Sequence, residues 1–218
     1  MPPAPAPARR RLPADERRRA VLDAARHEFA QRGYQGAGIA AIAASCGCSE
    51  PILYRHFASK QALFAAVLVD AAELLHERIA PVFAEQEDPL AALSAVAELA
   101  TQDELFIEIS RLRMLAVTLA DEPEIQAALA RTVTEMHGRL TALMTRARDG
   151  GFLRAGVEPA EAAWLWYGIA LQVGVRGSVY GTPGLVATRR TAASLIELLT
   201  AAPAAPAARP QKTKENRR

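Results

Sequence analysis

The sequence predicts an all-α protein of about nine helices, in which an N-terminal three-helix domain of the helix-turn-helix type precedes a larger C-terminal helical domain. Apolar residues recur at intervals of three and four along most of the chain, and no segment keeps the alternation of a half-buried strand. Turn-forming residues interrupt this pattern at places such as 121–123 and 149–151. With 50% hydrophobic residues among 218, the chain can bury a full core.

The stretch 39–60, IAAIAASCGCSEPILYRHFASK, predicts two short helices joined by a tight turn and then the start of a third. Gly47 can adopt the left-handed conformation that ends a helix, so the first helix ends just before it. Ser49 can cap the second helix, and Pro51 is tolerated in a first turn. Ala43 and Gly47 lie four residues apart, which allows the two helices to approach closely. The second helix is then free to enter a DNA major groove.

The run 33–68 resembles the N-terminal DNA-binding domain of TetR/AcrR-family transcriptional repressors, so the resemblance covers the first quarter to third of the chain. The matching positions are the family's Gly-aromatic pair, its Leu-Tyr-x-His-Phe run and its Ser-Lys pair: Gly33-Tyr34, 53–57 and Ser59-Lys60. The family often has Thr-Thr where this chain has Ala37-Gly38, and Lys in the position of Glu50. A carboxylate repels phosphate, so we expect a DNA-facing Glu50 to accept a hydrogen bond from a cytosine amine.

The resemblance implies a set of DNA contacts around the second, reader helix. In the family's usual geometry, Tyr54 and Lys60 contact phosphate. Five residues at the exposed start of the reader helix are expected near base edges: Ser49, Glu50, Pro51, Ile52 and Arg55. His56 belongs to the same stretch, and we assign it partly to packing.

Charge is distributed unevenly along the chain. Residues 1–60 carry ten Lys and Arg against five Asp and Glu, whereas residues 61–208 carry eleven against eighteen. A basic head on an acidic body suits double-stranded DNA as a partner for the head alone. Without the reader motif, arginines that only keep a surface soluble would be the simpler interpretation.

We expect four segments: a disordered basic arm at 1–12, the DNA-binding domain at 13–58, an effector-binding and dimerisation domain at 59–201, and a disordered basic tail at 202–218. The arm either follows DNA phosphates or has no role. The sequence shows no secretory signal, and its longest uncharged apolar run, 162–175, is too short to span a bilayer. We therefore expect a cytoplasmic protein that does not enter a membrane.

A long helix is predicted to begin at Ser59 and to end at Pro81, with a wide apolar stripe along it. Its first turn offers unpaired amides and Lys60 to a DNA phosphate, while its far end lies within the larger domain. The helix therefore either moves the reader when the body shifts or acts as a rigid connector.

The body contains five further predicted helices, at 89–101, 104–120, 123–149, 159–179 and 185–201. The segment 162–179 is apolar nearly all round, so it must be buried on two sides. One side is expected to pack into its own domain. The other is expected to pack against a second copy of the chain, together with four residues of the last helix: Leu195, Ile196, Leu198 and Leu199. The family's usual dimer, a four-helix bundle of these two helices, implies the same homodimer.

Six large side chains of the body are candidates for an effector pocket: Phe106, Met114, Met136, His137, Trp164 and Tyr167. Large apolar and Met side chains line such cavities, although core packing is the simpler interpretation of each one taken alone. We expect neither a cofactor nor a metal. His76 and His137 lie on separate helices without a defined carboxylate, and Cys46 and Cys48 lack a second ligand pair, so packing is the simpler interpretation of both cysteines.

Three functions remain open. A dimeric transcriptional repressor, released from a near-palindromic operator by a small and largely apolar effector, accounts for the reader motif, the basic head and the apolar face together. A constitutive DNA-binding dimer leaves the large body unexplained. An enzyme is the weakest alternative, because the sequence has no Gly-rich phosphate loop after a strand, no nucleophile elbow and no metal-ligand constellation. A body cavity that opens to solvent would favour the first function over the second.

Overall fold

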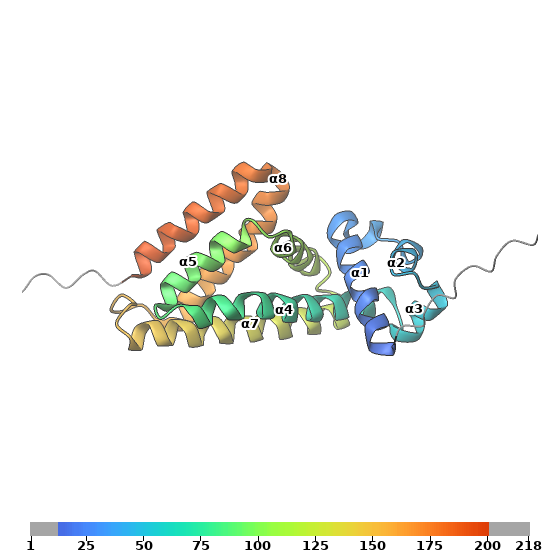
Figure 1. The fold of residues 1–218 in the computed structure, drawn as a ribbon, viewed down its shortest axis with the longest axis horizontal. Helices are drawn as coiled ribbons and strands as arrows, with labels where there is room; N and C mark the ends of the chain where they lie inside the picture. The colour runs from blue at the N-terminus through green and yellow to red at the C-terminus, as the bar shows by residue number, and fades with distance from the viewer. Residues whose placement is uncertain (1–12, 201–218) are drawn as a thin grey trace, which may run out of the picture.

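The computed structural model describes residues 13–200, so the expectations for the arm at 1–12 and the tail at 202–218 lie outside the described residues. Eight helices follow one another: α1 (Ala14–Gly36), α2 (Ile39–Ser45), α3 (Glu50–His56), α4 (Lys60–Glu85), α5 (Pro89–Ala100), α6 (Glu104–Val117), α7 (Pro123–Asp149) and α8 (Pro159–Leu199). Extended pairing within 13–200 is limited to one isolated bridge between Leu153 and Thr200. The predicted all-α fold is confirmed (Figure 1).

Helix α8 bends at Gly181, whose φ of 59° and ψ of −142° are not helical. The two parts on either side of this bend correspond to the last two helices that the sequence predicted. Only glycine adopts this backbone conformation without strain, which explains why the chain turns there. Helix α1 also contains one residue with non-helical backbone angles, Gly33, with a φ of 69° and a ψ of 174°.

The head consists of α1, α2 and α3 and sits at one end of an elongated molecule (Figure 1). Its core is closed by an aromatic cluster. The Phe29 and Phe64 ring centroids lie 4.9 Å apart edge to face, and those of Tyr34 and Phe64 lie 5.5 Å apart. Because Phe64 belongs to α4, this cluster fixes the head on the first turns of that helix.

The body is built on α4 and α7, which run side by side along its length, with α5, α6 and α8 packed above them (Figure 1). The prediction that α4 ends at Pro81 is wrong, because the helix continues to Glu85. Proline removes one helical hydrogen bond, but Ile79, Val82 and Phe83 around it pack against the core and hold the last turn in place. Among residues 13–200, no helix is both long and apolar enough to cross a membrane.

Candidate nucleic-acid interface and effector cavity

The turn between α2 and α3 is a backbone feature set by Gly47. Its φ is +67°, and the Cys48 amide donates to the Ala43 carbonyl at 2.9 Å. A Cβ built on Gly47 would meet no atom within 4 Å. The glycine is therefore required by the left-handed conformation, and the expectation that it permits close helix approach is wrong.

Helix α3 and the residue that follows it bury two side chains in the head and leave most of the others exposed. Leu53 is fully buried and Phe57, just after the helix, is 4% exposed, so they anchor α3 on the head core. The outward face carries five of the predicted DNA contacts: Ser49, Glu50, Pro51, Tyr54 and Arg55. Ile52 and His56 are partly buried at its edges. Ser49 occupies the N-cap position of α3, but its side chain makes no capping hydrogen bond. Helix α3 thus exposes polar side chains and one aromatic ring, and its buried residues hold it on the head core.

Lys60 opens α4 beside this face and folds back over the end of α1. Its Nζ lies 5.0 Å from the centroid of the Tyr34 ring and 3.5 Å from the carbonyl oxygen of Gln35. Burial lowers the pKa of the Lys60 ammonium below its usual value. Ser59 caps the helix, its Oγ accepting from the Ala62 amide at 2.9 Å. The predicted phosphate contact thus belongs to a partly exposed lysine that is already positioned by its neighbours.

Cys46 and Cys48 lie at the turn with their Sγ atoms 3.0 Å apart, and both pack against the head core. Burial, together with the hydrogen bond between Cys48 and Cys46, raises the pKa of Cys48 to about 11. The described part of the chain contains no group of three or more His, Cys, Asp or Glu side chains arranged to hold a metal ion. Protonated thiols of this kind behave as small apolar groups.

The body contains a partly open cavity of about 60 Å³ between α4, α5, α6, α7 and α8. Three of the six predicted pocket residues line it: Phe106, Met136 and Tyr167. Met114 does not, and its side chain is 40% exposed on α6. Trp164 and His137 also lie away from the cavity, with their rings stacked 4.2 Å apart and the tryptophan 46% exposed.

Arg113 is a cavity residue that the sequence analysis missed. It is only 6% exposed, its guanidinium carbon lies 5.6 Å from the Tyr167 ring centroid, and its Nη2 is buried without a hydrogen-bond partner. The position follows Phe106 by seven residues and Ile109 by four, which places it on the buried stripe of α6. An arginine on an apolar stripe was the signal that could have identified it.

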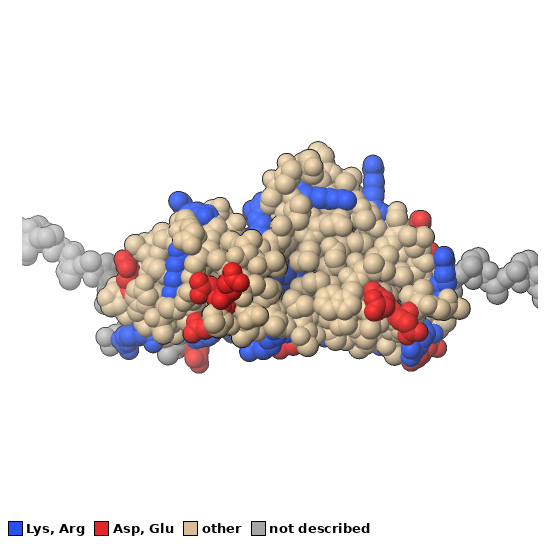
Figure 2. Space-filling view, turned by 180° about the vertical axis from the view of Figure 1, so that it is seen from behind, with Lys and Arg blue, Asp and Glu red and all other residues tan. Residues whose placement is uncertain are grey.

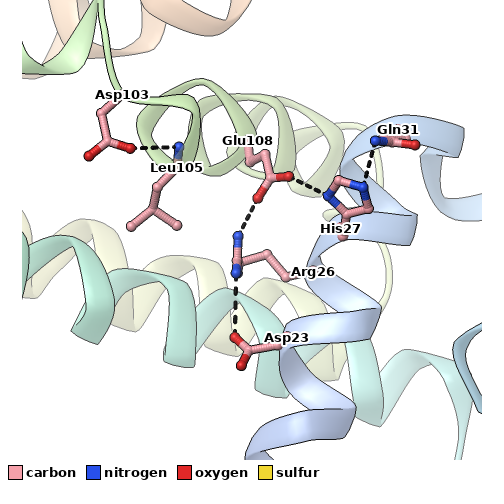
Figure 3. A network of polar contacts seen from close by, with 7 residues as sticks. All are labelled: Asp23, Arg26, His27, Gln31, Asp103, Leu105 and Glu108. Carbon is pink, nitrogen blue, oxygen red and sulfur yellow. Dashed lines mark hydrogen bonds and ion pairs between the residues drawn. The ribbon is translucent and has the colours of Figure 1, made fainter. Parts of the chain in front are cut away.

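A polar bridge joins α1 of the head to α6 of the body (Figure 3). Glu108 of α6 is 6% exposed, and its Oε1 lies 2.7 Å from His27 Nδ1 of α1. Its Oε2 accepts from Arg26, which also contacts Asp23. The His27 ring is half-exposed and still forms part of a contact between head and body.

The outer face of α8 carries the exposed apolar residues of the predicted dimer contact. Trp164, Leu165 and Leu198 are 46%, 55% and 62% exposed, and they border a shallow apolar groove. Leu195 and Ile196 are partly buried, and Leu199 is buried in its own subunit at 4% exposure. Leu199 therefore packs inward, in contrast to the expectation. From behind, broad uncharged areas separate small groups of basic and acidic side chains (Figure 2).

Comparison with known proteins agrees with this architecture. The family described as bacterial regulatory proteins of the tetR family matches residues 21–67. The transcriptional activator FasR of Mycolicibacterium smegmatis is 53% identical over 58 residues, covering 27% of this chain and 26% of FasR. The match thus spans about a quarter of that relative's length.

Two further proteins match over longer stretches. The nucleoid occlusion factor SlmA of Marinobacter nauticus is 30% identical over 133 residues, covering 55% of this chain and 68% of SlmA. The solved structure of the transcriptional regulator FadR from Bacillus subtilis, in complex with stearoyl-CoA, has a TM-score of 0.68 at 17% identity, covering 82% of this chain and 96% of FadR. That likeness concerns the fold. With its matched head and shared architecture, the chain belongs to the TetR family of bacterial regulatory proteins.

Proposed function

We propose that this protein is a dimeric DNA-binding transcriptional repressor. Residues 13–58 read the operator, and residues 59–201 bind an effector and form the dimer. The observation that carries the proposal is the outward face of α3, where Glu50, Tyr54 and Arg55 are exposed while Leu53 is fully buried. A reader helix needs this combination, because base contacts discriminate sequences only when the helix is rigidly held.

Different residues make the two kinds of DNA contact. Tyr54 and Lys60 bind phosphate and set the register of the head on DNA. Arg55 and Glu50 reach base edges in the major groove, with the arginine suited to guanine and the carboxylate to a cytosine amine. The other residues of this surface complete the contact by shape: Ser49, Pro51, Ile52 and His56.

Dimerisation through the exposed apolar face of α8 presents two heads to one duplex. Packing Trp164, Leu165 and Leu198 against a second copy removes large apolar side chains from water. Two reader helices then contact half-sites about 34 to 36 Å apart or a multiple of this, and the operator is a near-palindrome.

A small, largely apolar effector in the body cavity lowers operator affinity. Its route to the head is α6, because this helix supplies Phe106 and Arg113 to the cavity wall and Glu108 to the bridge with α1. Helix α4 provides a second, covalent connection between head and body. A hundredfold loss of operator affinity requires that the effector bind the state that cannot bind DNA more tightly, by about 2.7 kcal/mol, than the state that can. This difference is within the usual range of coupling energies.

The test is selection of DNA fragments from a random pool by the wild-type protein, Arg55→Ala and Lys60→Ala. The wild type should recover a near-palindrome. Lys60→Ala should weaken binding to all sequences alike and reduce the salt dependence by about one unit, while Arg55→Ala should relax preference at particular base pairs. An unchanged motif with Arg55→Ala would remove its base-reading role. Recovery of no motif by the wild type would contradict the proposed function.

A further inference from the structure

The cavity wall is apolar except for a few polar side chains, and three of these are already paired. Ser110 Oγ donates to the Ala170 carbonyl at 3.2 Å, and Thr188 Oγ1 donates to the Gly184 carbonyl at 3.1 Å. Arg189 pairs at the surface with Glu98, their Nη1 and Oε1 atoms lying 3.1 Å apart. These groups are satisfied by the protein itself, so they do not call for a ligand.

Arg113 differs from them because its buried Nη2 has no partner. No Asp or Glu lines the cavity, and no carboxylate among residues 13–200 forms an ion pair with Arg113. Glu108 lies five residues earlier on the same helix, but Arg26 and His27 of the head occupy its two oxygens. The Tyr167 ring face contributes a weak attraction only.

An unpaired guanidinium in an apolar site is costly, and proteins normally match a buried charge with an opposite one. Burial lowers the pKa of Arg113, because it destabilises the charged form of the guanidinium. An anion placed against the guanidinium would reverse both effects, since charge-assisted hydrogen bonds to Arg are strong in a low-dielectric site.

We propose that the cavity binds an apolar molecule with one anionic group, a carboxylate or a phosphate, which pairs with Arg113 while the apolar body lies among Phe106, Met136 and Tyr167. The proposal rests on the proposed effector function for its effect on DNA, and on Arg113 for the charge of the ligand. The cavity of about 60 Å³ must widen to accept such a body. Phe106 and Arg113 of α6 line the cavity, so a widening that displaces α6 also displaces Glu108 and acts on the bridge to the head.

The experiment compares probes that share an eight-carbon chain and differ in the head group: octanoate, octyl phosphate, 1-octanol and octylamine. Affinity for the full-length protein is measured by isothermal titration calorimetry, and thermal unfolding is followed in parallel. The variants are Arg113→Met and, as a matched control on the same helix, Arg111→Met, which removes an arginine bonded to Ser178 near the surface.

At least one anion should bind the wild type ten times or more tighter than 1-octanol, and octylamine should bind weakest. Arg113→Met should abolish this preference, while Arg111→Met should keep it. Arg113→Met should also melt at a higher temperature than the wild type, since it removes an unpaired buried charge. Whether octanoate or octyl phosphate binds tighter tells which anionic group the site favours. Equal binding of octanol and both anions, binding by neither anion, or an anion preference that survives in Arg113→Met would overturn the proposal.

Operator affinity measured with each probe separates this proposal from the proposed function. An anion that binds through Arg113 and leaves operator affinity unchanged would keep the ligand class and remove the effector role. If octanol released the operator as effectively as octanoate does, the cavity would still be an effector site, but the effector would not need an anionic group.

Discussion

His27 Nδ1 of α1 and Glu108 Oε1 of α6 lie 2.7 Å apart, and this contact crosses the boundary between head and body. The second oxygen of Glu108 accepts from Arg26, so one buried carboxylate joins two side chains of the head to a helix that lines the cavity (Figure 3). The side-chain route therefore supplements the continuous helix α4, which was the connection apparent from the sequence.

Glu108→Ala should destabilise the protein by about 3 kcal/mol, because it leaves a largely buried Arg26 without its partner. Urea unfolding measures this free energy. Arg32→Ala is the control, since it removes an exposed arginine that pairs with Glu28 and should cost less than about 1 kcal/mol. Equal effects of the two substitutions would show that the bridge adds nothing to stability.

Gly174→Ala should destabilise the protein by about 1 to 3 kcal/mol, the usual cost of overpacking. A Cβ at position 174 of α8 would lie 2.7 Å from Ser110 Cβ and 2.9 Å from the Ser110 carbonyl carbon, so α6 would have to move. Gly138→Ala on α7 is the matched control, because a Cβ there meets nothing within 4 Å and should stabilise the helix by about 1 kcal/mol. Thermal unfolding of the two variants should shift in opposite directions.

Leu165→Glu should convert the proposed dimer to a monomer, because it places a charge on the apolar face of α8, where the leucine is 55% exposed. Val117→Glu, at an apolar position on α6 that is 62% exposed, is the control and should remain dimeric. Light scattering after size-exclusion chromatography gives the masses. A Leu165→Glu protein of unchanged mass would place the dimer interface elsewhere.

The thiol of Cys48 should react slowly with iodoacetamide near neutral pH. Its pKa is about 11, so at pH 8 about one thiol in a thousand is ionised. Cys46→Ala removes the neighbour's hydrogen bond and charge, both of which raise that pKa, and should accelerate alkylation of Cys48. Peptide mass spectrometry between about pH 7 and pH 10 measures both rates. Identical profiles would mean that burial alone raises the pKa.

Asp70→Asn should stabilise the protein at neutral pH. Burial, assisted by the charges of Asp23 and Glu73, raises the pKa of Asp70 in the folded state. The folded protein then holds the proton more tightly than the unfolded chain, so the contribution of Asp70 to stability is lost as pH rises through its folded pKa. The advantage of Asp70→Asn should shrink as pH falls towards the unfolded value of about 3.9. Urea unfolding at several pH values checks this, with exposed Asp121→Asn as control.

The helices themselves were predictable from the sequence, because their signals are local. Ser59 at the start of α4 and the breaks before Pro123 and after Asp149 stand where the structure has them. The reader helix followed from Gly47, which ends the helix before it, and from Ser49 and Pro51 at its start. Pro81 misled the prediction because tertiary packing of its neighbours outweighed one missing hydrogen bond.

Which face of each body helix meets the cavity was decided only by tertiary structure. Periodicity identifies an apolar stripe on one helix, but it does not say whether that stripe faces a cavity, a core or a second subunit. Tyr167 therefore lines the cavity while Trp164, three residues earlier on the same helix, faces outward. Glu108 pairs with two side chains of α1, whereas no other helix in the described part of the chain brings a carboxylate to Arg113. Residues that are distant in the chain pair only in the folded protein, because a local sequence pattern does not show which helix will lie opposite.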